Sequence, residues 1–214
     1  MNKQPPSALK NIRALLFDLG NVLIDVDFER CARLWSEHSG VPVETLAARF
    51  RVDAAYEAFE CGDITGDAYF DALRRQLRVD LPDDILRRGW HAVIRDEKPG
   101  IRQCLTRLKG RFPLYVMTNT NPEHERIWAE VHQELLAHFD GVFVSSRMGC
   151  RKPEARAYRK VAQATGRPCS QILFFDDSEE NIQGAARCGM AGVLVDSNET
   201  IRQWTERLLG VKDD

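Results

Sequence analysis

The sequence predicts an α/β protein with a doubly wound parallel sheet and an inserted helical domain. Five short apolar runs predict the buried strands, because each is rich in branched or aromatic residues and is followed by a polar residue. These runs are Ala14–Phe17, Leu114–Met117, Val142–Val144, Ile172–Phe175 and Val193–Val195. Helix-like stretches separate the last four runs, and strands that alternate with helices are typical of a parallel sheet.

The first run stands apart, because about 100 residues separate it from the second. A single crossover helix cannot fill that distance. Apolar residues recur there at helical spacing, Thr65 is a helix-start residue, and Gly40 is a helix-stop residue. No alternating strand pattern is recognisable. We therefore predict a core domain of residues 1–27 and 98–214 and a helical insert of residues 28–97.

Three helices are predicted between the later strands. The first follows Pro122, the second follows Pro153 and the third follows Ser178, and the last two end just before a glycine. Proline near a helix start and glycine just after its end are the usual helix boundaries. A helix over Glu199–Leu209 completes the predicted core.

The composition excludes several classes of protein. The 214 residues are 43% hydrophobic and 29% charged, unlike a disordered, collagen-like or coiled-coil chain. The formal net charge of −2 argues against a dedicated nucleic-acid-binding protein. No membrane-spanning apolar stretch or signal peptide is recognisable. Six scattered cysteines indicate reduced thiols, so we expect a cytoplasmic protein, with monomer or homodimer left open.

Polar residues follow four of the predicted strands. They are Asp18, then Thr118 and Asn119, then Ser145 and Ser146 with Lys152 shortly after, and finally Asp176 and Asp177. Open parallel sheets bind ligands at the carboxyl ends of their strands, so these residues should converge. Clustered carboxylates require a cation, and oxygen ligands favour Mg²⁺. Since a carboxylate can attack phosphorus, the expected reaction is phosphoryl transfer through an aspartyl-phosphate.

Four motifs in this order resemble those of the haloacid dehalogenase-like (HAD) hydrolases. They are FDLGNVLID, VMTNTN, CRKPEA and FFDDSEENIQGA. The resemblance covers the whole core and implies a Rossmann-like sheet, with the helical insert as a type-1 cap. Within the family, the stretches GNVLIDVDF, RKPEARAY and FFDD resemble those of a bacterial α-D-glucose-1-phosphate phosphatase. That similarity implies a phosphatase acting on a small phosphorylated metabolite, such as the sugar phosphate glucose 1-phosphate.

The resemblance also implies a metal site. Asp18 is then both the nucleophile and a Mg²⁺ ligand, and the backbone carbonyl of Gly20 is a second ligand. Asp177 supplies a direct carboxylate ligand, whereas Asp176 lies near the metal through a water molecule. Asn181 supports the loop that carries these carboxylates.

The phosphate-binding and catalytic residues implied by the resemblance come from the second and third motifs. Thr118 and the backbone N–H of Asn119 bind the phosphate. Lys152 bridges the nucleophile and the phosphate, and so completes the catalytic pair with Asp18.

One position departs from the family pattern. Most phosphatases of the superfamily read D-x-D in the first motif, and the second aspartate protonates the leaving alcohol and later activates water. Gly20 occupies that position here, and the lost general acid–base catalysis is typically worth about 10²–10⁴-fold in rate. Asp25, Asp27 and His124 are candidate substitutes. The two aspartates also fit a capping or tethering role at the hinge, and His124 fits the first turn of its helix.

Other activities remain open. Gly20 favours a catalytically weak phosphate-binding protein as the alternative, and it argues against a phosphomutase, which needs the second carboxylate. A haloacid dehalogenase needs no such acid, but it does not carry the paired acidic metal site of Asp176 and Asp177. The aromatic residues of the insert could dock a partner, although their helical spacing indicates core packing.

Overall fold

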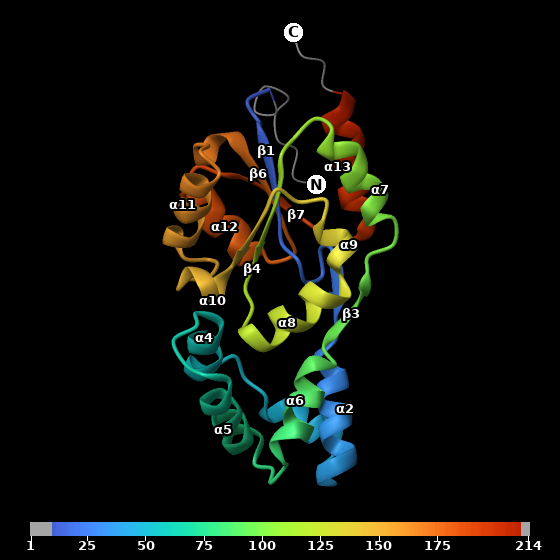
Figure 1. Cartoon of the computed structure of the whole chain (residues 1–214), viewed down its shortest axis with the longest axis vertical. Coiled ribbons are helices and arrows are strands. Elements are labelled where there is room, and N and C mark those ends of the chain that lie inside the picture. Colours follow the sequence, from blue (N-terminus) through green and yellow to red (C-terminus); the bar gives the residue numbers. More distant parts are fainter. Residues whose placement is uncertain (1–9, 211–214) are drawn as a thin grey trace.

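The computed structural model describes residues 10–210 and contains a central five-stranded sheet (Figure 1). The strands are β1 (Ala14–Phe17), β4 (Leu114–Thr118), β5 (Gly141–Val144), β6 (Ile172–Asp176) and β7 (Ala191–Leu194). They lie in the order β5-β4-β1-β6-β7, and every neighbouring pair is parallel. The predicted α/β class and parallel sheet are therefore confirmed. All five predicted strands are present, with the last beginning two residues earlier than predicted.

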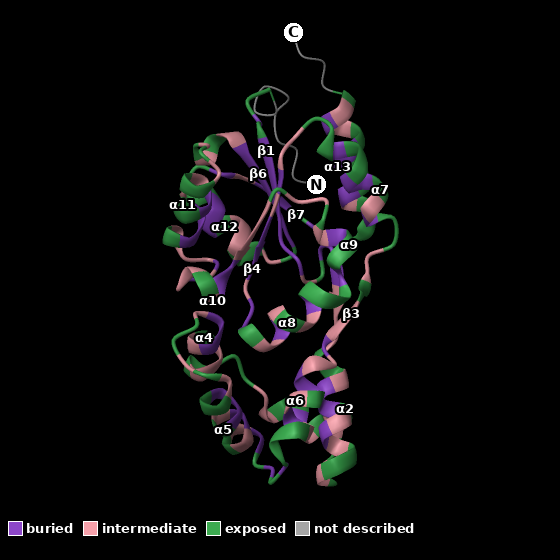
Figure 2. Cartoon of the chain, in the orientation of Figure 1, coloured by how far each residue is buried: buried purple, intermediate pink, exposed green. Residues whose placement is uncertain are grey.

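Helices cover both faces of this sheet. They are α7 (Ile101–Lys109), α8 (Pro122–Val131), α9 (Gln133–Leu136), α10 (Ser145–Met148), α11 (Ala155–Ala164), α12 (Glu179–Arg187) and α13 (Asn198–Gly210), with a 3₁₀ turn at Cys169–Gln171. Alternate residues of β1 point to opposite faces. Leu15 and Phe17 pack with α7 and α13, whereas Ala14 and Leu16 pack with α11 and α12. The three central strands β4, β1 and β6 are almost wholly buried, the edge strands β5 and β7 are partly buried, and the outer helix faces are exposed (Figure 2).

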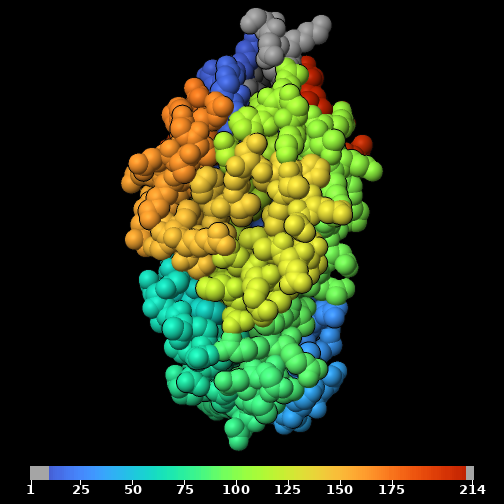
Figure 3. All heavy atoms as spheres, viewed as in Figure 1, coloured from blue at the N-terminus to red at the C-terminus, as the bar shows by residue number. Residues whose placement is uncertain are grey.

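The insert is a helical layer at one end of the sheet. It comprises α2 (Phe28–Ser39), α3 (Val43–Arg49), α4 (Ala54–Glu60), α5 (Gly66–Leu77) and α6 (Asp83–His91). A separate apolar cluster holds these helices together, with Trp35, Phe59, Tyr69, Phe70 and Trp90 buried in it. The aromatic residues at helical spacing therefore form a core, as predicted. In Figure 3 the surface of the insert, teal to green, abuts that of the core.

Three local predictions need correction. Two short strands, β2 (Ile24–Val26) and β3 (Ile94–Glu97), pair antiparallel where the chain enters and leaves the insert. The sequence prediction missed both, because pairing of distant segments stabilises strands too short to show alternation. It also missed α7, whose N-cap Gly100 supplies no capping side chain. The helix predicted after Pro122 is divided at His132 into α8 and α9.

Two expectations about the chain as a whole can be compared with the structure. All six cysteines are free thiols. Within residues 10–210, none of the helices has the length and apolar character needed to cross a bilayer.

Candidate active site

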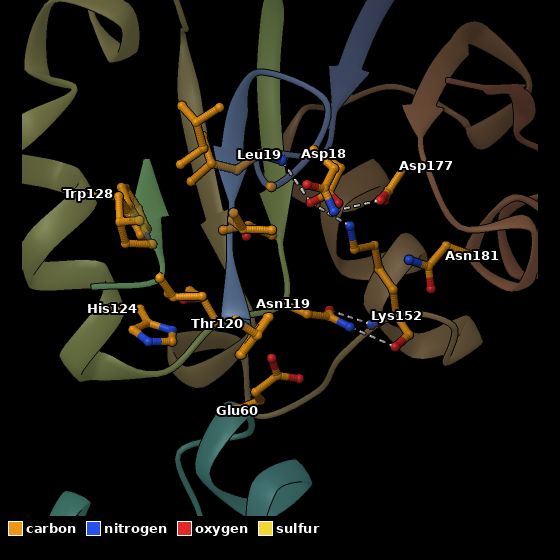
Figure 4. A pocket seen from close by; sticks show the side chains of 18 of the residues that line it. Asp18, Leu19, Glu60, Asn119, Thr120, His124, Trp128, Lys152, Asp177 and Asn181 are labelled. Carbon is orange, nitrogen blue, oxygen red and sulfur yellow. Dashed lines mark hydrogen bonds and ion pairs between the residues drawn. The ribbon is translucent and has the colours of Figure 1, made fainter. Parts of the chain in front are cut away.

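A cavity of about 180 Å³ lies where the carboxyl ends of β1 and β4 face the insert (Figure 4). From the core it is lined by Asp18, Gly20, Thr118, Asn119, His124, Lys152, Asp177 and Asn181. From the insert and its two connecting strands it is lined by Ile24, Val26, Phe28, Tyr56, Glu60, Val93 and Ile94. The structure thus gathers most of the sequence-predicted site residues around one cavity; Asp25, Asp27 and Asp176 are not part of its lining.

Lys152 links two buried carboxylates at the base of the cavity. Its Nζ lies 2.8 Å from Asp18 Oδ1 and 2.6 Å from Asp176 Oδ2, and the lysine is 1% exposed. Burial lowers the pKa of Lys152, but Asp18 and Asp176 outweigh it and hold that pKa above its ordinary value. The lysine therefore stays protonated between the two carboxylates.

The carboxylates around Asp18 carry more negative charge than one lysine can neutralise. Burial raises the pKa of its carboxyl to about 7, with Asp176 and Asp177 adding to the rise and Lys152 opposing it. The Leu19 N–H donates to Asp18 Oδ1 at 2.7 Å and fixes the carboxylate beside the lysine. A further cation is the simplest way to stabilise this charge.

The three carboxylates of this cluster fit such a cation. Asp18, Asp176 and Asp177 place one oxygen each within 4.8 Å of one another. Asp176 Oδ1 accepts hydrogen bonds from the Ser178 N–H at 2.8 Å and from Asn181 Nδ2 at 2.9 Å. Asp177 is exposed to the cavity. An all-oxygen donor set of this kind suits a hard divalent cation such as Mg²⁺.

The loops after β4 and β5 are fixed to each other beside this cluster. The Asn119 side chain donates from Nδ2 to the Lys152 carbonyl at 2.9 Å and accepts the Lys152 N–H at 2.8 Å. The buried Ser145 hydroxyl accepts the Thr120 N–H at 2.8 Å and donates to the Thr120 carbonyl at 3.0 Å. These paired hydrogen bonds fix the loops that carry Thr118 and Lys152, which both line the cavity. From the sequence, Ser145 is predicted only to lie at a strand end.

Neither aspartate near the hinge faces the cavity. Asp25 lies on β2 between Ile24 and Val26, which both line the cavity, so its side chain points the other way and pairs with Lys98. Asp27 caps α2 and accepts the Glu29 N–H at 3.0 Å. Both side chains therefore tether the hinge, and their geometry does not favour proton transfer to a substrate.

His124 lines the cavity but has no free ring nitrogen. Its Nε2 lies 2.9 Å from the Trp90 carbonyl, its Nδ1 lies 3.2 Å from Asn121 Nδ2, and its ring stacks on Trp90. Burial lowers the pKa of His124 to about 3, so the ring is neutral. A neutral imidazole that donates one hydrogen bond and accepts another is a poor proton donor.

Glu60 is the cavity residue that sequence reasoning missed. It ends α4, is 4% exposed, and projects from the insert toward the core residues (Figure 4). Burial raises the pKa of the Glu60 carboxyl, although Arg151, Tyr56 and Lys152 oppose the rise. Its position depends on how α4 packs against the core, which no local sequence signal reveals.

Comparison with known proteins gives a consistent set of relatives. Residues 12–189 match the family model of the haloacid dehalogenase-like hydrolases. The chain is 25% identical to drimenol cyclase drtB of Aspergillus calidoustus over 93% of this chain, but it spans only 37% of that longer protein. It is 29% identical to sesquiterpene phosphatase astK of Aspergillus oryzae, over 88% of this chain and 92% of that protein.

A solved structure shares the fold. The HAD family enzyme bt-2542 of Bacteroides thetaiotaomicron, crystallised with magnesium and inorganic phosphate, superposes with a TM-score of 0.75 at 24% identity. The match covers 87% of this chain and 96% of that enzyme.

Proposed function

This chain belongs to the haloacid dehalogenase-like hydrolase family, and on that premise we propose that it is a Mg²⁺-dependent phosphatase of small phosphorylated metabolites. The observation that carries the proposal is the cluster in which Lys152 lies within 2.8 Å of Asp18 and 2.6 Å of Asp176. A carboxylate held beside a buried ammonium and two further carboxylates is suited to attack a phosphoryl group. The phosphatase relative and the magnesium and phosphate bound by the bt-2542 enzyme support this reading.

In the proposed mechanism Asp18 attacks phosphorus and forms an aspartyl-phosphate, which water then hydrolyses. Lys152 holds the attacking carboxylate in place and binds a phosphate oxygen, while the Thr118 hydroxyl and the Asn119 N–H bind the others. Asp18, Asp177 and the Gly20 carbonyl would hold Mg²⁺, which supplies charge stabilisation to the transferring phosphoryl group when bound. Asp176 accepts a hydrogen bond from Lys152 and so orients the lysine. Asn181 donates to Asp176 and steadies the loop that carries Asp177.

We further propose that residues 28–97 form a cap over a core of residues 1–27 and 98–214. The β2–β3 ladder carries both connections between these parts and is the natural hinge. The cavity lies between them, so opening of the cap would admit substrate and closing would exclude water.

The substrate class that we test first is a sugar phosphate. It follows from the similarity of the motifs to the α-D-glucose-1-phosphate phosphatases, and an anomeric phosphate has a leaving group that departs readily. The cap side of the cavity is largely apolar, with Val26, Phe28, Val93 and Ile94 in its lining. Phosphates of less polar alcohols therefore belong in the same panel.

Release of inorganic phosphate from this panel, with Mg²⁺ and with EDTA, tests the proposal. Wild-type protein should turn over at least one compound only with Mg²⁺, and Asp18→Asn should abolish that turnover without unfolding the protein. Undiminished hydrolysis by Asp18→Asn would refute the proposal. Thermal stabilisation by Mg²⁺ and phosphate without any turnover would instead establish the alternative, a phosphate-binding protein.

A further inference from the structure

The first motif leaves the leaving group without a proton donor. Gly20 has no side chain, and a Cβ at this position would already lie 3.3 Å from Val26 Cγ1. Asp25 and Asp27 face away from the cavity, and both ring nitrogens of His124 are occupied. Any acid that protonates the leaving oxygen must therefore come from elsewhere in the cavity wall.

Glu60 is the remaining carboxylate of that wall. Within the described part of the chain, the carboxylates that line the cavity are Asp18, Asp177 and Glu60, and the first two belong to the cation cluster. Glu60 comes from the opposite side, on the cap, which is where the leaving group must lie when Asp18 attacks from the core. The side chain is more than nine-tenths buried.

The contacts of Glu60 leave a buried carboxylate oxygen without a hydrogen-bond partner among the described residues. Its Oε2 lies 2.9 Å from Arg151 Nε, yet neither atom makes an aligned hydrogen bond. Arg151 also donates from Nη1 to Glu57 Oε1 at 2.7 Å, so two carboxylates share one guanidinium. Tyr56, on the same helix, lowers the pKa of Glu60 and so opposes the effect of burial.

From this arrangement we infer that Glu60 is the general acid and base of the reaction, supplied by the cap in place of the side chain that position 20 lacks. The inference rests on the proposed phosphatase function. Burial also raises the pKa of Glu60 against the opposing effects of Arg151, Tyr56 and Lys152, which favours the protonated form needed for the first step.

Both half-reactions balance through this one carboxyl group. Asp18 attacks phosphorus, the bond from phosphorus to the leaving oxygen breaks, and that oxygen takes the electron pair of the bond and the proton of Glu60. The alcohol departs. The Glu60 carboxylate then takes a proton from water as the water oxygen attacks the phosphorus of the aspartyl-phosphate. Inorganic phosphate leaves, and Asp18 and protonated Glu60 are regenerated.

A structural role for Glu60 makes a different prediction. If Glu60 only fastened the cap to Arg151, its loss would resemble the loss of Glu57, which pairs with the same arginine from the same helix. Glu57 is the matched control, because its side chain is 55% exposed and does not line the cavity.

The test is the first turnover of Glu60→Gln and Glu57→Gln, measured by rapid quench on two substrates. p-Nitrophenyl phosphate releases an anion that needs no proton, whereas an alkyl phosphate releases an alkoxide that does. For Glu60→Gln we expect a near wild-type burst of p-nitrophenolate that then stalls at the phosphoenzyme. We expect a loss of about 10²–10⁴-fold with the alkyl phosphate. Glu57→Gln should stay close to wild type on both substrates.

The pH dependence of the first-turnover rate is a second measurement, and it should not change if Glu60 has only a structural role. With the alkyl phosphate, the rate of the wild-type first turnover should fall at high pH, where Glu60 loses its proton. This fall should be absent in Glu60→Gln. Equal losses on both substrates, or equal losses in the two variants, would overturn the inference. If Glu60→Gln does not fold, Glu60→Asp replaces it. We expect Glu60→Asp to lose activity selectively on the alkyl phosphate. An equal loss on both substrates would refute the inference. If the wild type turns over and Asp18→Asn does not, the proposed phosphatase function holds whatever the result for Glu60. If the wild type shows no turnover that depends on Asp18, both the phosphatase function and the role of Glu60 are refuted.

Discussion

Asp18→Asn should make the cation-free protein more stable while it removes the nucleophile. The Asp18 carboxylate is buried with Asp176 and Asp177 nearby, and it shares the positive charge of Lys152 with Asp176. Asparagine keeps the size of the side chain and removes one negative charge. Lys152 keeps its partner Asp176, so the substitution does not strand a buried cation.

The expected gain follows from the pKa of Asp18. That pKa rises from an ordinary value of 3.8 to about 7 in the folded protein. Each tenfold change in proton affinity is worth about 1.4 kcal/mol, so the ionised carboxylate destabilises the fold by about 4 kcal/mol above pH 7. The folded state binds the Asp18 proton more tightly than the unfolded state, so the contribution of Asp18 to the free energy of unfolding falls as pH rises from about 4 to about 7. Below pH 4 this contribution vanishes.

Urea and thermal unfolding in EDTA at pH 4 to 8 measure this effect. At pH 8 Asp18→Asn should unfold with a free energy about 4 kcal/mol higher than wild type, or roughly 10 °C higher in Tm. The stability difference between variant and wild type should therefore grow as pH rises from 4 to 7, because only the wild type carries the Asp18 carboxyl group. Mg²⁺ should raise the wild-type Tm more than that of the variant, because the variant has lost one anionic ligand.

An Asp18→Asn variant that is less stable than wild type at pH 8 in EDTA would contradict the expected gain. A stability difference between the two proteins that stays constant from pH 4 to pH 8 would contradict it equally, since Asp18 is the titrating group that the variant lacks.

Three further substitutions test the packing of the site and the cap. Lys152→Met should abolish turnover and lower the free energy of unfolding by about 3–5 kcal/mol in urea, because it leaves two buried carboxylates unpaired; wild-type stability would contradict this. Gly62→Ala should lower kcat/KM by about 10²-fold, because its φ is +75° and its Cβ would lie 2.4 Å from a backbone carbonyl of α10 in the core. Gly40→Ala shares the positive φ but faces open space, so it should keep its kcat/KM, and equal losses would contradict the cap contact. Gly89→Ala should destabilise the cap by about 1–3 kcal/mol in urea unfolding, because its Cβ would lie 2.0 Å from Trp35 Nε1; an unchanged midpoint would contradict that packing.

Local sequence signals predicted most of the fold. The five strands of the sheet are apolar runs with polar ends, and burial on both faces makes such runs easy to recognise. Ile101, Leu105 and Leu108 of α7 also carry helical spacing, but Gly100 gives no capping signal at the helix start. The β2–β3 ladder has no local signal, because each strand is stabilised by a partner far away in the sequence.

In the candidate site, too, local sequence signals located some residues, whereas others are brought in only by tertiary packing. Strand ends placed Asp18, Thr118 and Asp177 at one cavity, because the topology of a parallel sheet dictates where its carboxyl ends meet. Glu60 lies on a helix with no pattern that marks its function, and it reaches the cavity only through the packing of the cap on the core. Residues supplied by an inserted domain need tertiary structure to be found.

The most direct test of the central claim is the intact mass of the protein after rapid acid quench during turnover. Wild-type protein should gain the mass of one phosphoryl group, which hydroxylamine should remove and which Asp18→Asn should not acquire. A phosphoryl group on any residue other than Asp18, or phosphate release by Asp18→Asn at the wild-type rate, would contradict it.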